Sequence, residues 1–236
     1  MRRMALALVL MSALGACTGG AAHPKSAGAH AIVEIAPVEA WKAVATSADQ
    51  ARIGALPGVW SHAIAGLKKP ARATLASEGA LLDPAGAKDL PALPPGPYRC
   101  RLLRFDARGG LAGFKPDFCV VTGDAKGVAL TKQTGSNLPG GWLHADGDHR
   151  LIFLGGQRSA AADTPPAYGT NDATDIAGVI ERVDAFRWRL TLTRAGKGAL
   201  LDVYELVPVT PEVPGATPAV PAPTPVSGKE LSARAL

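Results

Sequence analysis

The sequence predicts an α+β fold in which an N-terminal helical pair packs on a mostly antiparallel, barrel-like or strongly curved sheet of about eight strands. In the first third of the folded region, apolar residues recur at three-and-four spacing, as they do in an amphipathic helix. From Pro97 onward the pattern changes to short β-rich runs with turn residues between them. Short successive turns favour a meander in which neighbouring strands pair antiparallel.

The first 16 residues are predicted to be an export signal. Two arginines precede an apolar run of about 11 residues, which is shorter than the roughly 20 residues of a membrane-spanning helix. Small residues at 15–16 followed by Cys17 resemble the bacterial lipobox, in which the cysteine receives lipid and becomes the new amino terminus. The alternative is an ordinary signal peptide with an incidental cysteine. We expect a lipid anchor on the periplasmic face of the envelope, and Thr18 favours the outer membrane.

Two segments flank the predicted domain of residues 37–208. Residues 17–36 are rich in Gly and Ala without periodic apolar positions, which predicts a flexible tether. Residues 209–236 form a Pro/Ala-rich segment that has too little apolar surface to offset the entropy of ordering, so we expect a disordered tail.

The helical pair is predicted from two apolar series separated by Pro57-Gly58. The first series follows Pro37, a residue suited to the first turn of a helix. Because proline removes a donor and clashes with the preceding turn, Pro70 should kink or break the second helix. The two series are Trp41, Val44, Ala45 and Ala48, and then Trp60, Ile64, Leu67, Ala71 and Leu75.

The strands are predicted from β-rich runs between turn residues. Eight such strands in a meander would leave exposed edges unless the sheet curls, which favours a closed or nearly closed barrel, or a bent sheet that the helices cover. Asp146-Gly147 is typical of a two-residue type I′ hairpin turn. The runs lie near residues 97–106, 115–123, 127–134, 141–145, 149–155, 176–183, 186–194 and 199–207.

A disulfide between Cys100 and Cys119 is predicted for the exported chain. Export places the chain where thiols pair, and these two cysteines remain after Cys17 is lipidated. Both are symmetric about Gly109-Gly110, so a hairpin turning there would set them directly opposite each other, at a spacing a disulfide can bridge. The alternatives are a metal site, which would need more Cys or His nearby, and a reactive pair, which favours C-x-x-C spacing.

The charge balance excludes one class of partner. The chain has 25 basic and 20 acidic residues, and removal of the signal leaves a net charge of about +3. No Lys/Arg stripe of the kind found on nucleic-acid binders is present, so we expect no nucleic-acid partner. No cofactor motif is found, and none is predicted.

The chain resembles the domain-of-unknown-function family numbered 4893, which occurs in proteobacterial envelope proteins. One stretch is Lys132-Gln133-Thr134-Gly135-Ser136, after which the family motif commonly continues Gln-Arg and this chain has Asn137-Leu138. The resemblance spans about Trp41 to Pro208 and implies no activity. The stretches that carry it are 78–84, 94–101, 118–119, 132–136, 153–155, 168–169, 178–182, 187–190 and 201–208.

Three sets of residues are candidates for chemistry. A two-residue turn at Asp146-Gly147 would place His144 opposite His149, and two imidazoles on one face can hold zinc or copper. Ser136 lies in a glycine-containing loop, although it lacks a G-x-S-x-G elbow and a motif-linked base.

The third set consists of the carboxylates of Asp172 and Asp175 near Glu181, which suggest general acid/base catalysis. Their alternative interpretation is turn formation by the two Asp residues and pairing of Glu181 with Arg187 or Arg189.

Three classes of function remain after these observations. The first is a non-enzymatic binding or interaction module for a small apolar ligand, an envelope polymer or another envelope protein. The second is a barrel similar in layout to periplasmic protease inhibitors, which would insert the segment upstream of Trp41 into a protease. The third is a hydrolase that uses Ser136 or the carboxylates of residues 172–181. A hollow apolar barrel would favour a ligand, and a filled barrel a structural or protein-partner role.

Overall fold

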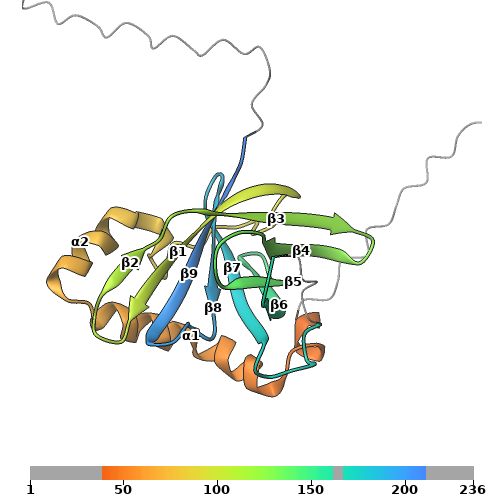
Figure 1. The fold of residues 1–236 in the computed structure, drawn as a ribbon, viewed down its shortest axis with the longest axis horizontal. Coiled ribbons are helices and arrows are strands. Elements are labelled where there is room, and N and C mark those ends of the chain that lie inside the picture. The colour runs from red at the N-terminus through yellow and green to blue at the C-terminus, as the bar shows by residue number, and fades with distance from the viewer. Residues whose placement is uncertain (1–38, 162–166, 211–236) are drawn as a thin grey trace, which may run out of the picture. The chain divides into compact units, whose positions relative to one another are not determined.

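The computed structural model describes residues 39–161 and 167–210, which form a closed antiparallel barrel with two α-helices on its outer face (Figure 1). The predicted export signal, Cys17 and the tether lie outside the described residues, as does all but the start of the tail. The strands are β1 (Gly96–Asp106), β2 (Leu111–Gly113), β3 (Asp117–Asp124), β4 (Gly127–Lys132), β5 (Leu138–Asp146), β6 (Arg150–Arg158), β7 (Asp175–Asp184), β8 (Arg187–Leu192) and β9 (Ala199–Pro208).

The barrel consists of eight strands in a meander that closes on itself. The order is β1-β3-β4-β5-β6-β7-β8-β9, every neighbouring pair is antiparallel, and β9 pairs with β1 from Tyr98↔Pro208 to Asp106↔Ala199. Closure removes the exposed edges that an open meander would leave. All eight predicted strands are confirmed, and β2 is an additional strand of three residues beside the end of β1.

The helical part starts with the 3₁₀ turn η1 (Ala40–Ala43) and continues with α1 (Ser47–Ala65), α2 (Lys69–Glu78) and η2 (Gly79–Leu81). Thr46 caps α1, since its Oγ1 accepts a hydrogen bond from the Asp49 N–H at 3.2 Å. The predicted helical pair is therefore present, but its boundaries differ from the prediction.

The two proline residues act differently from each other. The break predicted at Pro57-Gly58 is wrong, because α1 continues through Pro57. The lost backbone bond is tolerated there because Ile53, Leu56 and Trp60 are buried on one face of the helix, which holds both halves against the barrel. The break predicted near Pro70 is confirmed: α1 ends at Ala65, and Pro70 lies in the first turn of α2, where its missing donor costs nothing.

Two hydrophobic cores use opposite faces of the same strands. The inner core fills the barrel, and the outer core lies between the barrel and the helices. Along β9, Leu201 and Val203 point outward to the helices, whereas Tyr204 and Leu206 point inward. The inner core contains Leu93, Tyr98, Cys100, Cys119, Val121, Leu130, Phe153, Ile180, Trp188, Leu190, Leu192, Tyr204 and Leu206.

Trp60 of α1 is central to the outer core. Its ring meets Phe105 edge-to-face at 5.8 Å between centroids, and the Arg189 guanidinium lies 5.2 Å from its centroid. Arg189 is 1% exposed, and its charge is balanced by Glu181 at 2.7 Å. Its remaining donors bond carbonyl oxygens of residues 81, 83 and 84, so one buried cation joins β8, β7, the end of η2 and the chain that follows it.

The Cys100–Cys119 disulfide is formed, with sulfur atoms 2.08 Å apart and Cα atoms 5.9 Å apart. Its predicted register is wrong, because Cys100 pairs with Asp117 and Cys119 with Tyr98, which makes the cysteines diagonal neighbours. The cause is the turn: the Asp106 carboxylate accepts the N–H groups of Arg108 and Gly110, and Leu111 therefore pairs with Phe105. Those two hydrogen bonds also lower the pKa of Asp106.

Candidate functional site

The two ends of the barrel differ. A covering segment, residues 83–95, lies over one end: Leu93 enters the inner core, and the carbonyls of Pro91 and Pro94 accept hydrogen bonds from the Trp188 Nε1–H at 3.1 Å and the Tyr98 hydroxyl at 2.7 Å. Burial raises the pKa of Tyr98 to about 12, so this hydroxyl remains a donor. The opposite end, which we call the mouth, is hollow.

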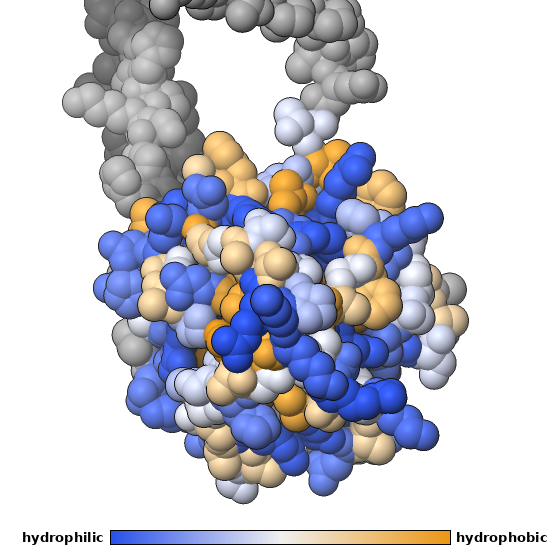
Figure 2. Space-filling model, turned by 90° about the vertical axis from the view of Figure 1, so that its left-hand side faces the viewer, coloured by the Kyte–Doolittle hydropathy of each residue, from blue (hydrophilic) through white to orange (hydrophobic). Residues whose placement is uncertain are grey.

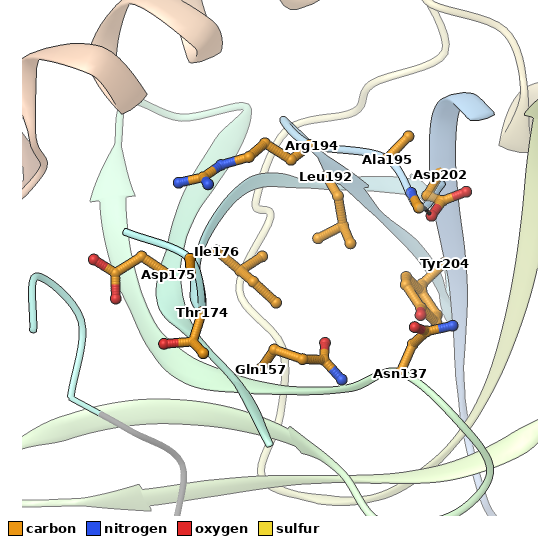
Figure 3. A pocket seen from close by; sticks show the side chains of 12 residues that line it. Asn137, Gln157, Thr174, Asp175, Ile176, Leu192, Arg194, Ala195, Asp202 and Tyr204 are labelled. Carbon is orange, nitrogen blue, oxygen red and sulfur yellow. Dashed lines mark hydrogen bonds between the residues drawn. The ribbon is translucent and has the colours of Figure 1, made fainter. Parts of the chain in front are cut away.

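The larger hollow of the mouth has a volume of about 310 Å³ (Figure 3). Ile176, Leu192 and the ring of Tyr204 supply apolar wall, and Figure 3 shows their side chains around the open space. The remaining lining is mainly polar. The full lining consists of Asn137, Gln157, Ala173, Thr174, Asp175, Ile176, Leu192, Arg194, Ala195, Gly196, Asp202 and Tyr204.

A second hollow of about 160 Å³ adjoins the first, since Asn137 and Tyr204 line both. It is lined by residues of β1, β3, β4 and β9 and of the segments that adjoin β3 and β5. Its lining consists of Leu102, Arg104, Phe114, Asp117, Lys132, Ser136, Asn137 and Tyr204. The mouth therefore extends across much of one barrel end.

Arg104 and Asp202 form a bidentate ion pair between β1 and β9. Nε and Nη2 of Arg104 donate to the two carboxylate oxygens at 2.6 and 2.7 Å, and Asp202 also accepts the Gly196 N–H at 2.9 Å. The hydrogen bonds to Asp202 raise the pKa of Arg104. The pair is neutral as a unit, and both oxygens of Asp202 already accept hydrogen bonds within the protein.

Tyr204 stands beside this pair with its ring in the inner core. Burial, followed by the nearby charge of Asp202, raises the pKa of its hydroxyl. The group therefore stays protonated at neutral pH and presents a hydrogen-bond donor to the mouth.

Lys132 organises the loop that ends at Asn137. Its ammonium donates to the carbonyls of Thr134 and Ser136 at 2.7 Å each and lies 2.8 Å from Asp117 Oδ2. All three of its N–H groups are thus used, so Lys132 is a structural cation. Gly135 has a φ of +73°, and a Cβ there would overlap the Asp117 carboxylate, which explains the glycine.

Ser136, the candidate nucleophile, lines the smaller hollow through this loop. Its carbonyl is held by Lys132, whereas its hydroxyl has no histidine or carboxylate partner among the described residues. The arrangement lacks the nucleophile–base contact that serine catalysis requires.

The two candidate metal ligands are not brought together. Asp146 pairs with Arg150, so the turn contains three residues, and His144 lies opposite Ile152 instead of His149. His149 Nδ1 is 2.8 Å from Asp89 Oδ1 at the surface, while burial lowers the pKa of His144. Within residues 39–161 and 167–210, no group of three His, Cys, Asp or Glu side chains is placed to hold a metal.

The candidate carboxylates are also separated. Asp175 and Glu181 are six residues apart on β7, or about 20 Å along an extended strand. Glu181 is paired with Arg189, as one of the two sequence interpretations expected, and the Asp175 carboxylate accepts the Gly169 N–H at 3.0 Å. In Figure 3 the Asp175 side chain points away from the hollow. Asp172 contributes its backbone carbonyl, which accepts from Arg194 at 2.7 Å.

A separate apolar groove lies between the end of α1 and α2, and Figure 2 shows apolar surface among hydrophilic side chains on the side that carries α2. Its wall includes Ile64, Leu75 and Leu82. Asp83 is the only ionisable residue that lines it, so the mouth is the richer candidate for specific recognition.

The sequence reasoning did not single out Arg104, Asp202 or Arg194. The alternation of the strands carries a signal for two of them. Arg104 lies at an inward-facing position after Tyr98, Cys100 and Leu102, and Asp202 lies at the inward-facing position before Tyr204. A charged residue at an inward position marks the polar end of a barrel. Two stretches of the family resemblance contribute to this mouth: residues 132–136 end there, and residues 201–208 begin there.

These observations define an eight-stranded antiparallel barrel with a filled interior, a helix-covered outer face and one hollow, half-polar end. The family model of the domain of unknown function DUF4893 matches residues 41–206, and the chain belongs to this family. Comparison with curated proteins and with solved structures yields no match. Among the residues that the structure describes, no helix has both the length and the apolar character needed to cross a membrane.

Proposed function

We propose that this protein is a non-enzymatic binding module that holds a small ligand in the mouth of its barrel. The observation that carries the proposal is the hollow of about 310 Å³ at one barrel end, which combines apolar wall with inward-facing polar groups. The barrel interior is filled, which is the outcome that the sequence reasoning linked to a structural or protein-partner role. A ligand is therefore restricted to the hollow end, since Phe153, Tyr98 and Trp188 belong to the inner core. Binding is favoured over catalysis because Arg104, Asp202 and Lys132 are already satisfied by partners within the protein.

The test is to purify the mature chain from its own envelope and identify bound small molecules by native mass spectrometry. Ile176→Trp places a large ring where Figure 3 shows a smaller side chain facing the hollow, and it should reduce the retained ligand at least tenfold. Val44→Trp adds similar bulk at an exposed position and should retain the ligand. Equal retention by both variants, with unchanged thermal unfolding, would place the ligand elsewhere and contradict the proposal.

We further propose that the module is exported and held on the periplasmic face of the envelope by lipid on Cys17, with the outer membrane favoured. Support comes from the signal pattern of residues 1–17 and from the Cys100–Cys119 disulfide, which suits an oxidising compartment. Labelled palmitate should enter the wild-type protein and not Cys17→Ser, and the variant should leave the membrane fraction. Incorporation of label into Cys17→Ser, or unchanged fractionation, would overturn the anchor without affecting the binding site.

A further inference from the structure

We propose that the ligand of the mouth is a small organic acid whose carboxylate is bound by Arg194 and whose apolar part lies against Ile176 and Leu192. This inference rests on the proposed function and names the chemical class of its ligand.

The cations of the mouth are not equivalent. Arg104, Lys132 and Arg194 line the two hollows. Arg104 is neutralised by Asp202 at 2.6 Å and Lys132 by Asp117 at 2.8 Å. Arg194 forms no ion pair with any described residue. Asp175, the third carboxylate of the lining, forms none either, but in Figure 3 its side chain points away from the hollow, so Arg194 is the cation of the mouth without a counter-charge.

Arg194 also has unused donors. Its Nη1 donates to the Asp172 carbonyl at 2.7 Å, and its buried Nε has no hydrogen-bond partner among the described residues. Figure 3 shows the side chain running along the rim of the larger hollow. A guanidinium presents five donors in a planar fork that matches a carboxylate, and a buried donor without a partner is costly. A bound carboxylate would meet both requirements.

The walls indicate what the acid is attached to. Ile176, Leu192 and the Tyr204 ring offer apolar contact, which a bare inorganic anion would not use. The Asn137 amide and the Tyr204 hydroxyl have no hydrogen-bond partner among the described residues, which leaves them available to polar substituents. The volume of about 310 Å³ is at the lower end for ligand pockets and suits a small molecule.

A metal ion fits the mouth less well than an acid does. Both oxygens of Asp202 accept hydrogen bonds from Arg104, and Asp117 faces the Lys132 ammonium. The Asp175 carboxylate lines the hollow by position but points away from it in Figure 3. No described carboxylate is therefore uncommitted and directed into the mouth, as a hard cation would require.

The experiment is calorimetric titration of the mature full chain with hexanoate, its uncharged match hexanamide, and inorganic phosphate. Hexanoate should bind at least tenfold more tightly than hexanamide, because a bidentate charge-assisted contact is absent from the amide. Arg194→Gln should abolish that preference and leave hexanamide binding unchanged. Lys197→Gln removes a charge from an exposed neighbouring residue and should keep the preference.

Each other outcome decides against one of the two proposals. Equal affinity for hexanoate and hexanamide, both lost in Ile176→Trp, would overturn the acid and leave the mouth as the binding site. Phosphate binding as tightly as hexanoate would show that the apolar walls are unused and would also overturn the organic acid. If no probe binds, the charge of the molecule that co-purifies decides: a neutral ligand overturns the inference, and absence of any ligand overturns the proposed function itself.

Discussion

Trp60→Ala is expected to lower the free energy of unfolding by about 3–5 kcal/mol, the usual range when a large buried aromatic residue is truncated. Trp60 is 5% exposed and contacts both Phe105 and the Arg189 guanidinium. The substitution removes apolar packing between α1 and the barrel, and it also takes the ring from a buried cation. Chemical unfolding monitored by far-UV circular dichroism measures the change.

Trp142→Ala is the matched control for this prediction. Trp142 is 40% exposed on the outer side of β5, so the same truncation should cost less than about 1 kcal/mol. Similar losses in the two variants would contradict the view that the helices stabilise the barrel through the outer core. Native mass spectrometry of Trp60→Ala would show in addition whether the mouth depends on that packing.

Loss of the Cys100–Cys119 disulfide is expected to lower the free energy of unfolding by about 3 kcal/mol, because the bond closes a short loop in the unfolded chain. The two cysteines are 19 residues apart, and both side chains are buried in the inner core. Cys100→Ala/Cys119→Ala avoids leaving a single thiol and places small apolar groups in the core. Unfolding of wild type and double variant should be compared under oxidising conditions.

Reducing agent separates the disulfide effect from the packing effect. It should destabilise the wild-type protein towards the stability of the double variant and leave the double variant unchanged. If the wild-type protein keeps its stability after complete reduction, verified by thiol titration, the bond contributes nothing to the fold. The prediction would then be wrong even if the double variant is unstable.

The sequence predicted most of the fold because its signals are local. Eight runs rich in strand-forming residues became eight strands, and the short turns between them led to antiparallel neighbours. Strand β2 was not predicted because its three residues are too few to show an alternation of apolar and polar positions. The helix break at Pro57 was predicted from the hydrogen bond that proline removes. The burial of Ile53, Leu56 and Trp60 against the barrel outweighs the loss of that bond, and the helix continues.

The candidate site was less predictable, because it depends on register and closure. The predicted Cys100–Cys119 disulfide is confirmed although the predicted strand register is wrong by two residues. Both cysteines face the interior, and diagonal neighbours are close enough to form the bond. The predicted pairing of His144 with His149 is wrong because the turn contains three residues instead of two. His149 lies in the turn, and only His144 pairs with a residue of the neighbouring strand. Arg104 and Asp202 are 98 residues apart, and no local pattern joins them.

The class of fold, the order of the strands, the pairing of the cysteines and the family could be predicted from the amino-acid sequence, because each is encoded in composition, alternation or short motifs. Which inward-facing residues meet at the mouth, and which cation among them lacks a counter-charge, depends on how the strands come together in the folded barrel. Arg104 reaches Asp202 because β9 pairs with β1, and Arg194, which follows β8, contacts only the backbone carbonyl of Asp172; neither contact is encoded in a local pattern.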